Sequence, residues 1–171
     1  MPTRLAVLET PFGWLGLAER DGKLTYLVLP RPNPESVRDE LARRHPAGEL
    51  SPPEQLVATP QLERYFRGEL QEFDLELELA GVPPFFRRAL DACARVPYGA
   101  TTTYRALASE LGDPKASRAV GGAMASNPIP IVIPCHRVVG STGSLTGFGG
   151  GLDQKQRLLA LEATHRHRPG K

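Results

Sequence analysis

The sequence predicts an α+β fold in which a small N-terminal sheet-plus-helix domain precedes a mainly helical C-terminal domain. Three short apolar runs near the N-terminus are bounded by turn residues, as strands usually are: 4–9, 13–19 and 23–29. From Pro84 onward, apolar residues recur at helical spacing instead. Between the two patterns, the segment 80–84 reads Ala-Gly-Val-Pro-Pro and interrupts any periodicity. We therefore expect two domains, 1–80 and 81–171.

The N-terminal half is expected to be a scaffold without chemistry of its own. Asp21-Gly22 between the second and third runs is a strong hairpin signal. Helical spacing follows at 35–44, and a further helix is expected at about 53–67. Residues 73–79 alternate apolar and acidic side chains, which predicts a half-exposed strand. The acidic residues of this half are mostly single, so we expect no catalytic cluster among them.

The C-terminal half is predicted to contain a helix-turn-helix. Thr101-Thr102-Thr103 offers a cap for a short helix at 104–111, and Gly112 is well placed to end that helix. Asp113-Pro114 then begins a second helix, which residues 115–126 carry. Two short helices joined by a tight turn that contains glycine form this motif.

The second helix of the motif is poor in large side chains. After Arg118, small residues occupy most positions: Ala119, Gly121, Gly122, Ala123 and Ala125. Small residues let a helix approach another surface closely, which serves either tight packing within the protein or entry into a DNA groove. Both interpretations fit the pattern, and the charge of this half favours the DNA groove.

Charge is distributed unevenly along the chain. Residues 1–82 contain nine Lys and Arg against fourteen Asp and Glu, whereas residues 83–171 contain twelve against five. A basic half suggests a polyanionic partner, because neutralising phosphates drives DNA binding that is independent of sequence. A merely solvated basic face stays open as an interpretation for the tail from Arg166 to Lys171.

The strand-like run 131–139 presents Cys135 beside His136. A thiol with an ordinary pKa of about 8.5 is only a few per cent thiolate at neutral pH, so a reactive Cys135 needs a group that lowers its pKa. The alternative is a buried core cysteine with an exposed His136, since neighbours in an extended chain point to opposite sides. Cys93 lies in a helical pattern and is expected in the core. A reducing compartment favours two free thiols over a disulfide.

The chain ends in a Gly-rich loop and a helix. Residues 140–151 contain six glycines and need a flexible or sharply turned backbone, but no Gly-Lys-Ser/Thr follows, so this is not a phosphate-binding P-loop. The helix expected at 152–163 should turn three leucines inward: Leu158, Leu159 and Leu161. Glu162, taken by itself, reads as a surface charge.

Two further expectations concern metal and location. The sequence has no CxxC and no clustered Cys/His spacing, so we expect no metal site. No apolar run approaches the roughly 18 residues of a membrane-spanning helix, and the N-terminus lacks the basic-then-apolar pattern of a secretion signal. We therefore expect a cytoplasmic protein.

The segment Pro134-Cys135-His136-Arg137-Val138 is more informative as a whole than its cysteine alone. With Asn127-Pro128 upstream and the Gly-rich loop downstream, it resembles the active-site signature of the O6-alkylguanine-DNA alkyltransferases, also called methylated-DNA-protein-cysteine methyltransferases. The resemblance continues through 118–124 to Glu162, so it covers most of the second half. The N-terminal half is similar mainly in layout.

This resemblance implies DNA repair by direct reversal. An O6-alkylguanine would be rotated out of the duplex, and its alkyl group would be transferred irreversibly to Cys135 in a single turnover. O4-alkylthymine is a second candidate substrate. The implied partner is double-stranded DNA contacted through its minor groove, with no diffusible cofactor, and the protein is expected to be a monomer.

Five positions match catalytic residues of the family: Cys135, His136, Glu162, Asn127 and Tyr104. The resemblance makes Cys135 the nucleophile, His136 the acceptor of its proton, and Glu162 the group that orients the imidazole. Asn127 would brace the turn before the active-site segment. Tyr104 would give a proton to the departing base.

The resemblance also implies contacts with DNA and with the flipped base. The implied DNA-binding residues are Arg118, Thr103, Ala119 and Ser141. Arg118 would fill the space that the flipped base leaves in the stack. The implied substrate pocket is lined by Met124, Pro130, Val138, Phe148 and Gly149. Phe148 and Gly149 stand where some relatives carry tyrosine and serine, so two hydroxyls that could bind the base are missing.

Three other interpretations compete with this one. A cysteine peptidase also uses Cys and His, but it usually brings its base from a distant segment. A non-catalytic lesion sensor shares the fold and lacks the reactive cysteine. A transcriptional regulator could use a helix-turn-helix, although major-groove readers normally carry larger polar side chains on the recognition helix. The combination of Cys135, His136 and Glu162 distinguishes the transferase from all three.

Overall fold

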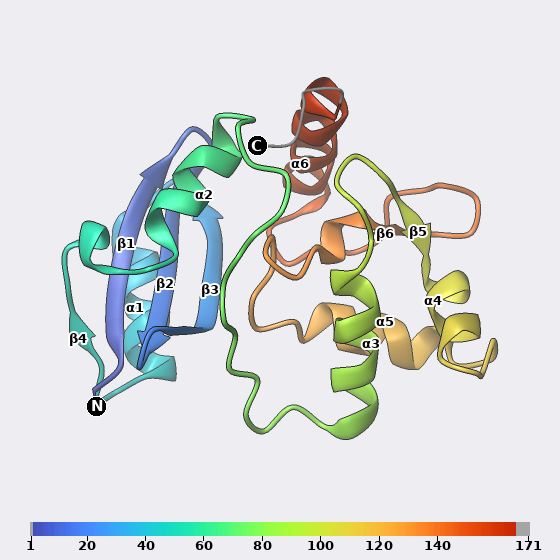
Figure 1. Cartoon of the computed structure of the whole chain (residues 1–171), viewed down its shortest axis with the longest axis horizontal. Helices are drawn as coiled ribbons and strands as arrows, with labels where there is room; N and C mark the ends of the chain where they lie inside the picture. Colours follow the sequence, from blue (N-terminus) through green and yellow to red (C-terminus); the bar gives the residue numbers. More distant parts are fainter. Residues whose placement is uncertain (1, 167–171) are drawn as a thin grey trace. The chain divides into compact units, whose positions relative to one another are not determined.

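The computed structural model describes residues 2–166, which form two compact units, 2–78 and 79–166 (Figure 1). This division lies two residues before the boundary expected from the sequence. The first unit holds the larger sheet and the second holds most of the helices, so the α+β class is confirmed. Within residues 2–166, no helix is both long and apolar enough to cross a membrane.

The first unit is built on a four-stranded sheet in the order β3-β2-β1-β4. β1 (Arg4–Thr10), β2 (Gly13–Arg20) and β3 (Lys23–Arg31) pair antiparallel, and the three predicted strands and the predicted hairpin between the second and third are confirmed. β4 (Glu49–Leu50) adds a parallel edge next to β1 and is too short to leave a periodic pattern. The β2–β3 hairpin turns at Asp21-Gly22, whose positive φ angles of 53° and 77° suit such a turn.

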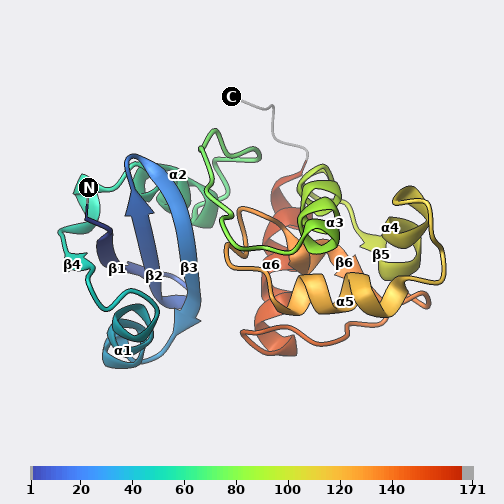
Figure 2. The ribbon, with the colours of Figure 1, turned by 90° about the horizontal axis from the view of Figure 1, so that it is seen from below.

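α1 (Pro34–Arg44) covers one face of this sheet (Figure 2). The helix begins after Asn33, whose side chain accepts hydrogen bonds from the backbone N–H groups of Glu35 and Ser36. One cluster of buried apolar side chains joins the helix to the sheet: Leu5, Ala18, Val28, Val37 and Leu41.

The single helix predicted at 53–67 is wrong. The chain forms a 3-10 turn, η1 (Pro53–Gln55), and then a separate helix, α2 (Thr59–Phe66). The buried carboxylate of Glu19 accepts the backbone N–H groups of the two residues before α2, at 2.9 and 2.8 Å. The side chain of Glu19, distant in the sequence, thus binds the backbone N–H groups between η1 and α2. Nothing in the local sequence of this segment indicates that contact.

The strand predicted at 73–79 is also wrong. In the described part of the chain this segment makes one isolated bridge, between Leu77 and Leu24, with backbone hydrogen bonds of 2.9 and 3.0 Å around it. The Gln61 side chain binds both backbone groups of Asp74, at 2.9 and 2.8 Å. A side chain therefore occupies the backbone groups that a neighbouring strand would have used.

The described second unit contains four α-helices: α3 (Pro84–Ala94), α4 (Tyr104–Glu110), α5 (Ser117–Ala125) and α6 (Leu152–His165). The first three of them pack against one another. β5 (Thr102–Thr103) and β6 (Val138–Val139) form a short parallel pair. This pairing fixes the start of α4 beside the chain that follows Cys135.

α4 and α5 form the helix-turn-helix. Thr103 caps α4 by accepting the backbone N–H of Ala106 at 3.0 Å. α5 begins at Ser117, later than the sequence predicts, because residues 114–116 form a turn. The Asp113 carboxylate accepts the backbone N–H of Lys115 at 3.0 Å within this turn.

Candidate active site

Cys135 lies in a turn and not in a strand. η2 (Cys135–Arg137) is a single 3-10 turn, and the run predicted to be strand-like forms a strand only at β6, apart from one isolated bridge between Ile133 and Pro130. Ile131 has a φ of 75°, and the backbone N–H of Cys135 donates to the carbonyl of Ile133 at 2.8 Å. These bonds within the segment fold the chain back on itself, so no ladder can form there.

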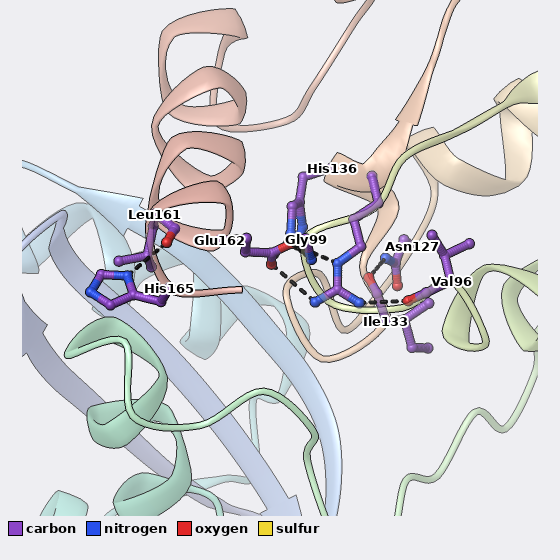
Figure 3. A network of polar contacts seen from close by, with 9 residues as sticks. Val96, Gly99, Asn127, Ile133, His136, Leu161, Glu162 and His165 are labelled. Atoms are coloured by element: carbon purple, nitrogen blue, oxygen red, sulfur yellow. Dashed lines mark hydrogen bonds and ion pairs between the residues drawn. The ribbon is translucent and has the colours of Figure 1, made fainter. Parts of the chain in front are cut away.

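Asn127 holds this turn from inside. Its amide nitrogen donates to the carbonyl of Ile133 at 2.9 Å (Figure 3). Its amide oxygen accepts the backbone N–H of Ile129 at 3.0 Å. The side chain thereby satisfies two backbone groups on either side of the positive-φ residue. The path of the chain into Cys135 depends on both bonds.

His136, Arg137 and Glu162 form a buried hydrogen-bonded network (Figure 3). His136 Nε2 lies 2.6 Å from Glu162 Oε2, and the Arg137 guanidinium donates to both carboxylate oxygens at 2.8 and 3.0 Å. Arg137 also donates to the carbonyl of Val96 at 2.6 Å. Burial raises the pKa of Glu162, but the hydrogen bonds and charges of His136 and Arg137 outweigh it and lower that pKa to about 2.

This network fixes the tautomer of His136. An ionised Glu162 can only accept, so the proton of the neutral imidazole lies on Nε2. His136 Nδ1 is buried and makes no hydrogen bond to the described residues. Burial and the positive charges of Arg137 and Lys155 lower the pKa of His136, against the opposing effect of Glu162, so the imidazole is neutral at physiological pH with Nδ1 as a free acceptor.

The Cys135 thiol is 6% exposed, and burial raises its pKa. A hydrogen bond from Asn127 and the positive charge of Lys155 act in the opposite direction. His136 does not lower the pKa of this thiol directly, contrary to what its position in the sequence suggests. Cys93 is buried in α3, and burial raises its pKa as well.

Lys155 is a site residue that the sequence reasoning missed. Its side chain is fully buried, and its ammonium donates to the carbonyls of Val138 at 2.7 Å and Thr146 at 2.9 Å. A signal existed: Lys155, Leu158 and Glu162 are spaced three and four apart and so share one helix face. That face is the buried one. Two leucines predicted to point inward are only half-buried: Leu159 and Leu161.

Tyr104 begins α4 and is half-buried. Its hydroxyl accepts a hydrogen bond from the Thr146 hydroxyl at 3.0 Å, and its ring centre lies 5.9 Å from Lys155 Nζ. The phenol, the Gly-rich loop and the buried ammonium therefore meet at one place. Thr146 is a second residue that the sequence reasoning did not single out.

The helix-turn-helix presents the residues predicted to bind DNA as follows. Arg118 and Ala119 are exposed on α5, and Ser141 is exposed in the Gly-rich loop. Thr103 is half-buried, and its hydroxyl caps α4. A Cβ added at Gly121 would meet nothing within 4 Å. The packing of the described residues therefore does not explain the glycine at this position.

The residues predicted to line the pocket differ in burial. Three of them are buried, namely Met124, Pro130 and Val138. Phe148 is half-buried and Gly149 is exposed, both in the loop that Lys155 holds through Thr146. Among residues 2–166, no group of three or more His, Cys, Asp or Glu side chains is arranged to hold a metal ion.

Comparison with known proteins identifies the family. Residues 84–164, which contain all five candidate catalytic residues, match the family described as 6-O-methylguanine DNA methyltransferase, DNA binding domain. The methylated-DNA-protein-cysteine methyltransferase of Mycolicibacterium paratuberculosis is 47% identical over 159 residues, which are 92% of this chain and 91% of that protein.

Solved structures agree with this match. The crystal structure of Mycobacterium tuberculosis O6-methylguanine methyltransferase is similar with a TM-score of 0.82 and 38% identity, over 98% of this chain and 96% of that one. The crystal structure of Mycobacterium tuberculosis OGT in complex with DNA gives 0.80 and 40%, over 95% and 94% of the two chains. With nearly half of its residues identical to those of a relative over almost its whole length, this chain belongs to the methylated-DNA-protein-cysteine methyltransferases.

Proposed function

We propose that this protein repairs double-stranded DNA by direct reversal, moving the alkyl group of O6-alkylguanine irreversibly onto Cys135. One observation carries the proposal: the turn that holds Cys135 also holds His136, whose buried imidazole is hydrogen-bonded to the ionised Glu162 of α6. Membership of a family named for transfer to cysteine supports it, and so does the similar protein from M. tuberculosis that was crystallised in complex with DNA.

The alkylated base leaves the duplex to react. Cys135 is 6% exposed, and O6 of guanine is stacked inside DNA, so neither atom can reach the other without movement of the base. Flipping costs a few kcal/mol, and less for a poorly paired damaged base. The α4–α5 motif contacts the minor groove through Arg118, Ala119 and the capping Thr103, and the Gly-rich loop contacts it through Ser141. The exposed Arg118 fills the vacated stack, and the open space over Gly121 lets α5 approach closely.

The transfer is a displacement at carbon. The Cys135 sulfur forms a bond to the alkyl carbon while the bond from that carbon to O6 breaks, and its electron pair remains on the guanine. His136 Nδ1 takes the thiol proton, and Glu162 stabilises the imidazolium that results. Tyr104 gives a proton to the guanine anion and takes one back from water, to which His136 returns the proton of the thiol. Overall, a proton replaces the alkyl group on the base.

The reaction ends after one turnover, because a thioether has no easy route back to a thiolate. Cys93 is buried with a raised pKa and is not suited to remove the group. O4-alkylthymine carries its alkyl group on an equivalent exocyclic oxygen and is a second substrate by the same displacement. The protein acts as a monomer without a cofactor. Met124, Pro130, Val138, Phe148 and Gly149 surround the flipped base.

Intact-protein mass spectrometry tests the proposal. The protein is incubated with a duplex that carries one O6-methylguanine, with Cys135→Ala in parallel. We expect a gain of one methyl group per protein, mapped to Cys135 and absent from the variant. No mass change despite lesion-selective binding would overturn the transferase and favour a non-catalytic lesion sensor.

A further inference from the structure

The hydroxyl of Thr146, in the Gly-rich loop, is held against the hydroxyl of Tyr104. The Thr146 carbonyl accepts a hydrogen bond from Lys155 at 2.9 Å, which fixes the backbone of this loop residue to α6. A Cβ added at Gly140 would lie 3.6 Å from Thr146 Cγ2, so the methyl group lies beside the start of the loop. Because a β-branched side chain has few rotamers, the methyl group also places the hydroxyl, which donates to the Tyr104 hydroxyl at 3.0 Å.

Tyr104 is held in place by separate contacts. It follows Thr103, which pairs with Val139 where β5 and β6 lie side by side (Figure 1), and the Gly-rich loop begins directly after Val139. The Thr103 hydroxyl also caps the first turn of α4. Within residues 2–166, the Thr146 hydroxyl is the one group that hydrogen-bonds to the Tyr104 hydroxyl. This bond therefore joins the start of the helix-turn-helix to the Gly-rich loop.

A structural role does not account for the hydroxyl of Thr146. The residue is exposed, so its side chain is not needed to fill the core. The carbonyl that Lys155 binds belongs to the backbone and would be present with any residue at this position. Thr142, in the same loop, instead donates its hydroxyl within the loop, to Ser144 at 3.3 Å. Among the described residues, the contact that needs a hydroxyl at position 146 is the one with Tyr104.

We propose that Thr146 is a positioning residue for alkyl transfer, which directs the proton of Tyr104 toward the base and stabilises the phenolate that remains. The inference rests on the proposed function, in which Tyr104 protonates the departing guanine. A phenol can accept a hydrogen bond and donate its own proton at the same time. Because Thr146 donates to the Tyr104 oxygen, the proton of the phenol is left for another acceptor. In the proposed reaction that acceptor is the guanine anion.

One proton moves in this step, and the hydrogen bond from Thr146 is kept. The O–H bond of Tyr104 breaks, and the proton binds the electron pair of the guanine anion. Thr146 keeps its own proton and now donates to an anionic oxygen, in a hydrogen bond roughly twice as strong as one between neutral groups. Thr146 therefore stabilises the state after proton transfer more than the state before it, which is the condition for accelerating a chemical step.

Single-turnover transfer from an O6-methylguanine duplex tests the proposal with Thr146→Val, which keeps the shape of the side chain and removes the hydroxyl. At saturating duplex we expect the rate to fall about 10- to 100-fold, the effect of losing a hydrogen bond to a charged group. The Kd for the duplex should not change, and Thr146→Ser should restore most of the rate. Thr142→Val, which removes a hydroxyl from the same loop, should transfer like the wild-type protein. Urea unfolding checks that the variants are folded.

A double-mutant cycle separates positioning of the phenol from a general effect on the loop. Tyr104→Phe has no proton to donate, so Thr146→Val should cause no further loss of rate in that background. Equal effects of Thr146→Val with and without the phenol would overturn the proposal. Should Thr146→Val not fold, the same cycle is run with Thr146→Ala and compared with Thr146→Ser.

Methyl iodide provides a second readout, because iodide leaves without needing a proton. The rate at which it methylates Cys135, with peptide mass mapping to separate Cys135 from Cys93, should be the same in Thr146→Val and the wild-type protein. A slower rate in the variant would place the effect of Thr146 at the sulfur and refute the proposal.

The two proposals fail in different ways. Transfer by Thr146→Val at the rate of an active wild-type protein would refute the role of Thr146 alone. No methyl transfer from the duplex by the wild-type protein would refute the proposed function, and the role of Thr146 with it.

Discussion

The side chains of Arg137 and His136 share the Glu162 carboxylate, whose Oε1 also accepts the backbone N–H of Gly99 at 3.4 Å. One oxygen accepts from Arg137, and the other accepts from both Arg137 and His136. Because an arginine side chain stays charged at any physiological pH, Glu162 remains ionised whatever the state of the imidazole. His136 therefore always meets an acceptor at Nε2 and keeps Nδ1 for the thiol proton. Arg137 was part of the recognised sequence signature, yet its role emerges only from these contacts.

Glu162→Gln is expected to slow alkyl transfer by roughly 10²- to 10⁴-fold, because a neutral amide no longer fixes the tautomer of His136. It also leaves the Arg137 guanidinium buried without a counter-charge, which costs about 3–5 kcal/mol of stability. Single-turnover transfer from an O6-methylguanine duplex and urea unfolding measure the two effects. Glu63→Gln, at an exposed carboxylate of α2, is the matched control. A single-turnover rate of alkyl transfer by Glu162→Gln equal to that of the wild-type protein would contradict the role of Glu162 in orienting His136.

Acid is expected to destabilise the second unit in two steps. The pKa of His136 is lowered on folding, so its stabilising contribution is complete above the ordinary value of about 6.5 and is lost as the pH falls below it. The pKa of Glu162 falls from 4.5 to about 2 on folding. Its contribution of about 3 kcal/mol is present above pH 4.5 and disappears as the pH approaches 2.

Denaturant unfolding between about pH 8 and pH 3 measures both steps. Glu162→Gln has no carboxyl group at this position and should lose the lower step. A stability that is constant across this range would contradict the buried neutral histidine and the buried carboxylate together.

Among the elements, α5 contains two adjacent glycines, Gly121 and Gly122, that have different surroundings. A Cβ at Gly122 would lie 3.3 Å from the Phe86 ring, so this glycine serves packing against α3. A Cβ at Gly121 would meet nothing within 4 Å, so that glycine serves no packing among the described residues. Of the two interpretations of the small residues in this helix, tight packing therefore applies to Gly122, and an approach to DNA is our proposal for Gly121.

Gly121→Ala is expected to stabilise α5 by up to about 1 kcal/mol, and Gly122→Ala by less, because Phe86 must move. Gly121→Leu should remain folded but bind duplex DNA at least about tenfold more weakly, since its side chain would hold the helix away from the groove. Thermal unfolding and fluorescence anisotropy measure the two effects. Gln156→Leu, on the exposed face of α6, is the control. Unchanged binding by Gly121→Leu would contradict the groove contact.

For the whole molecule, the uneven charge assigns DNA binding to the C-terminal half. Residues 83–171 hold twelve basic and five acidic residues, against nine and fourteen in residues 1–82. Phosphate contacts release counterions from DNA. The logarithm of the affinity for duplex DNA should therefore fall linearly with the logarithm of the salt concentration, with a slope of about −0.9 for each phosphate contact. Arg105→Ala, in the exposed part of α4, should reduce the slope by about one.

Lys23→Ala, at an exposed lysine beside the β2–β3 turn, should leave the slope unchanged. Binding titrations at several salt concentrations provide the comparison. Equal effects of the two substitutions would mean that both halves contact phosphates, and the assignment to the C-terminal half would be wrong.

The sequence by itself determined the features that local signals encode. Short apolar runs bounded by turn residues predicted the three N-terminal strands, Asp21-Gly22 predicted the hairpin, Thr103 marked the start of α4, and the run around Cys135 indicated the family. Only the tertiary structure decided the contacts between distant residues. Glu19 breaks the expected helix before α2, Arg137 meets Glu162, and Lys155 lies buried beside Val138. The physical reason is that a charged side chain is stable in the protein interior only beside a specific partner. An analysis of hydrophobic periodicity treats every charged residue as exposed, so it cannot find such partners.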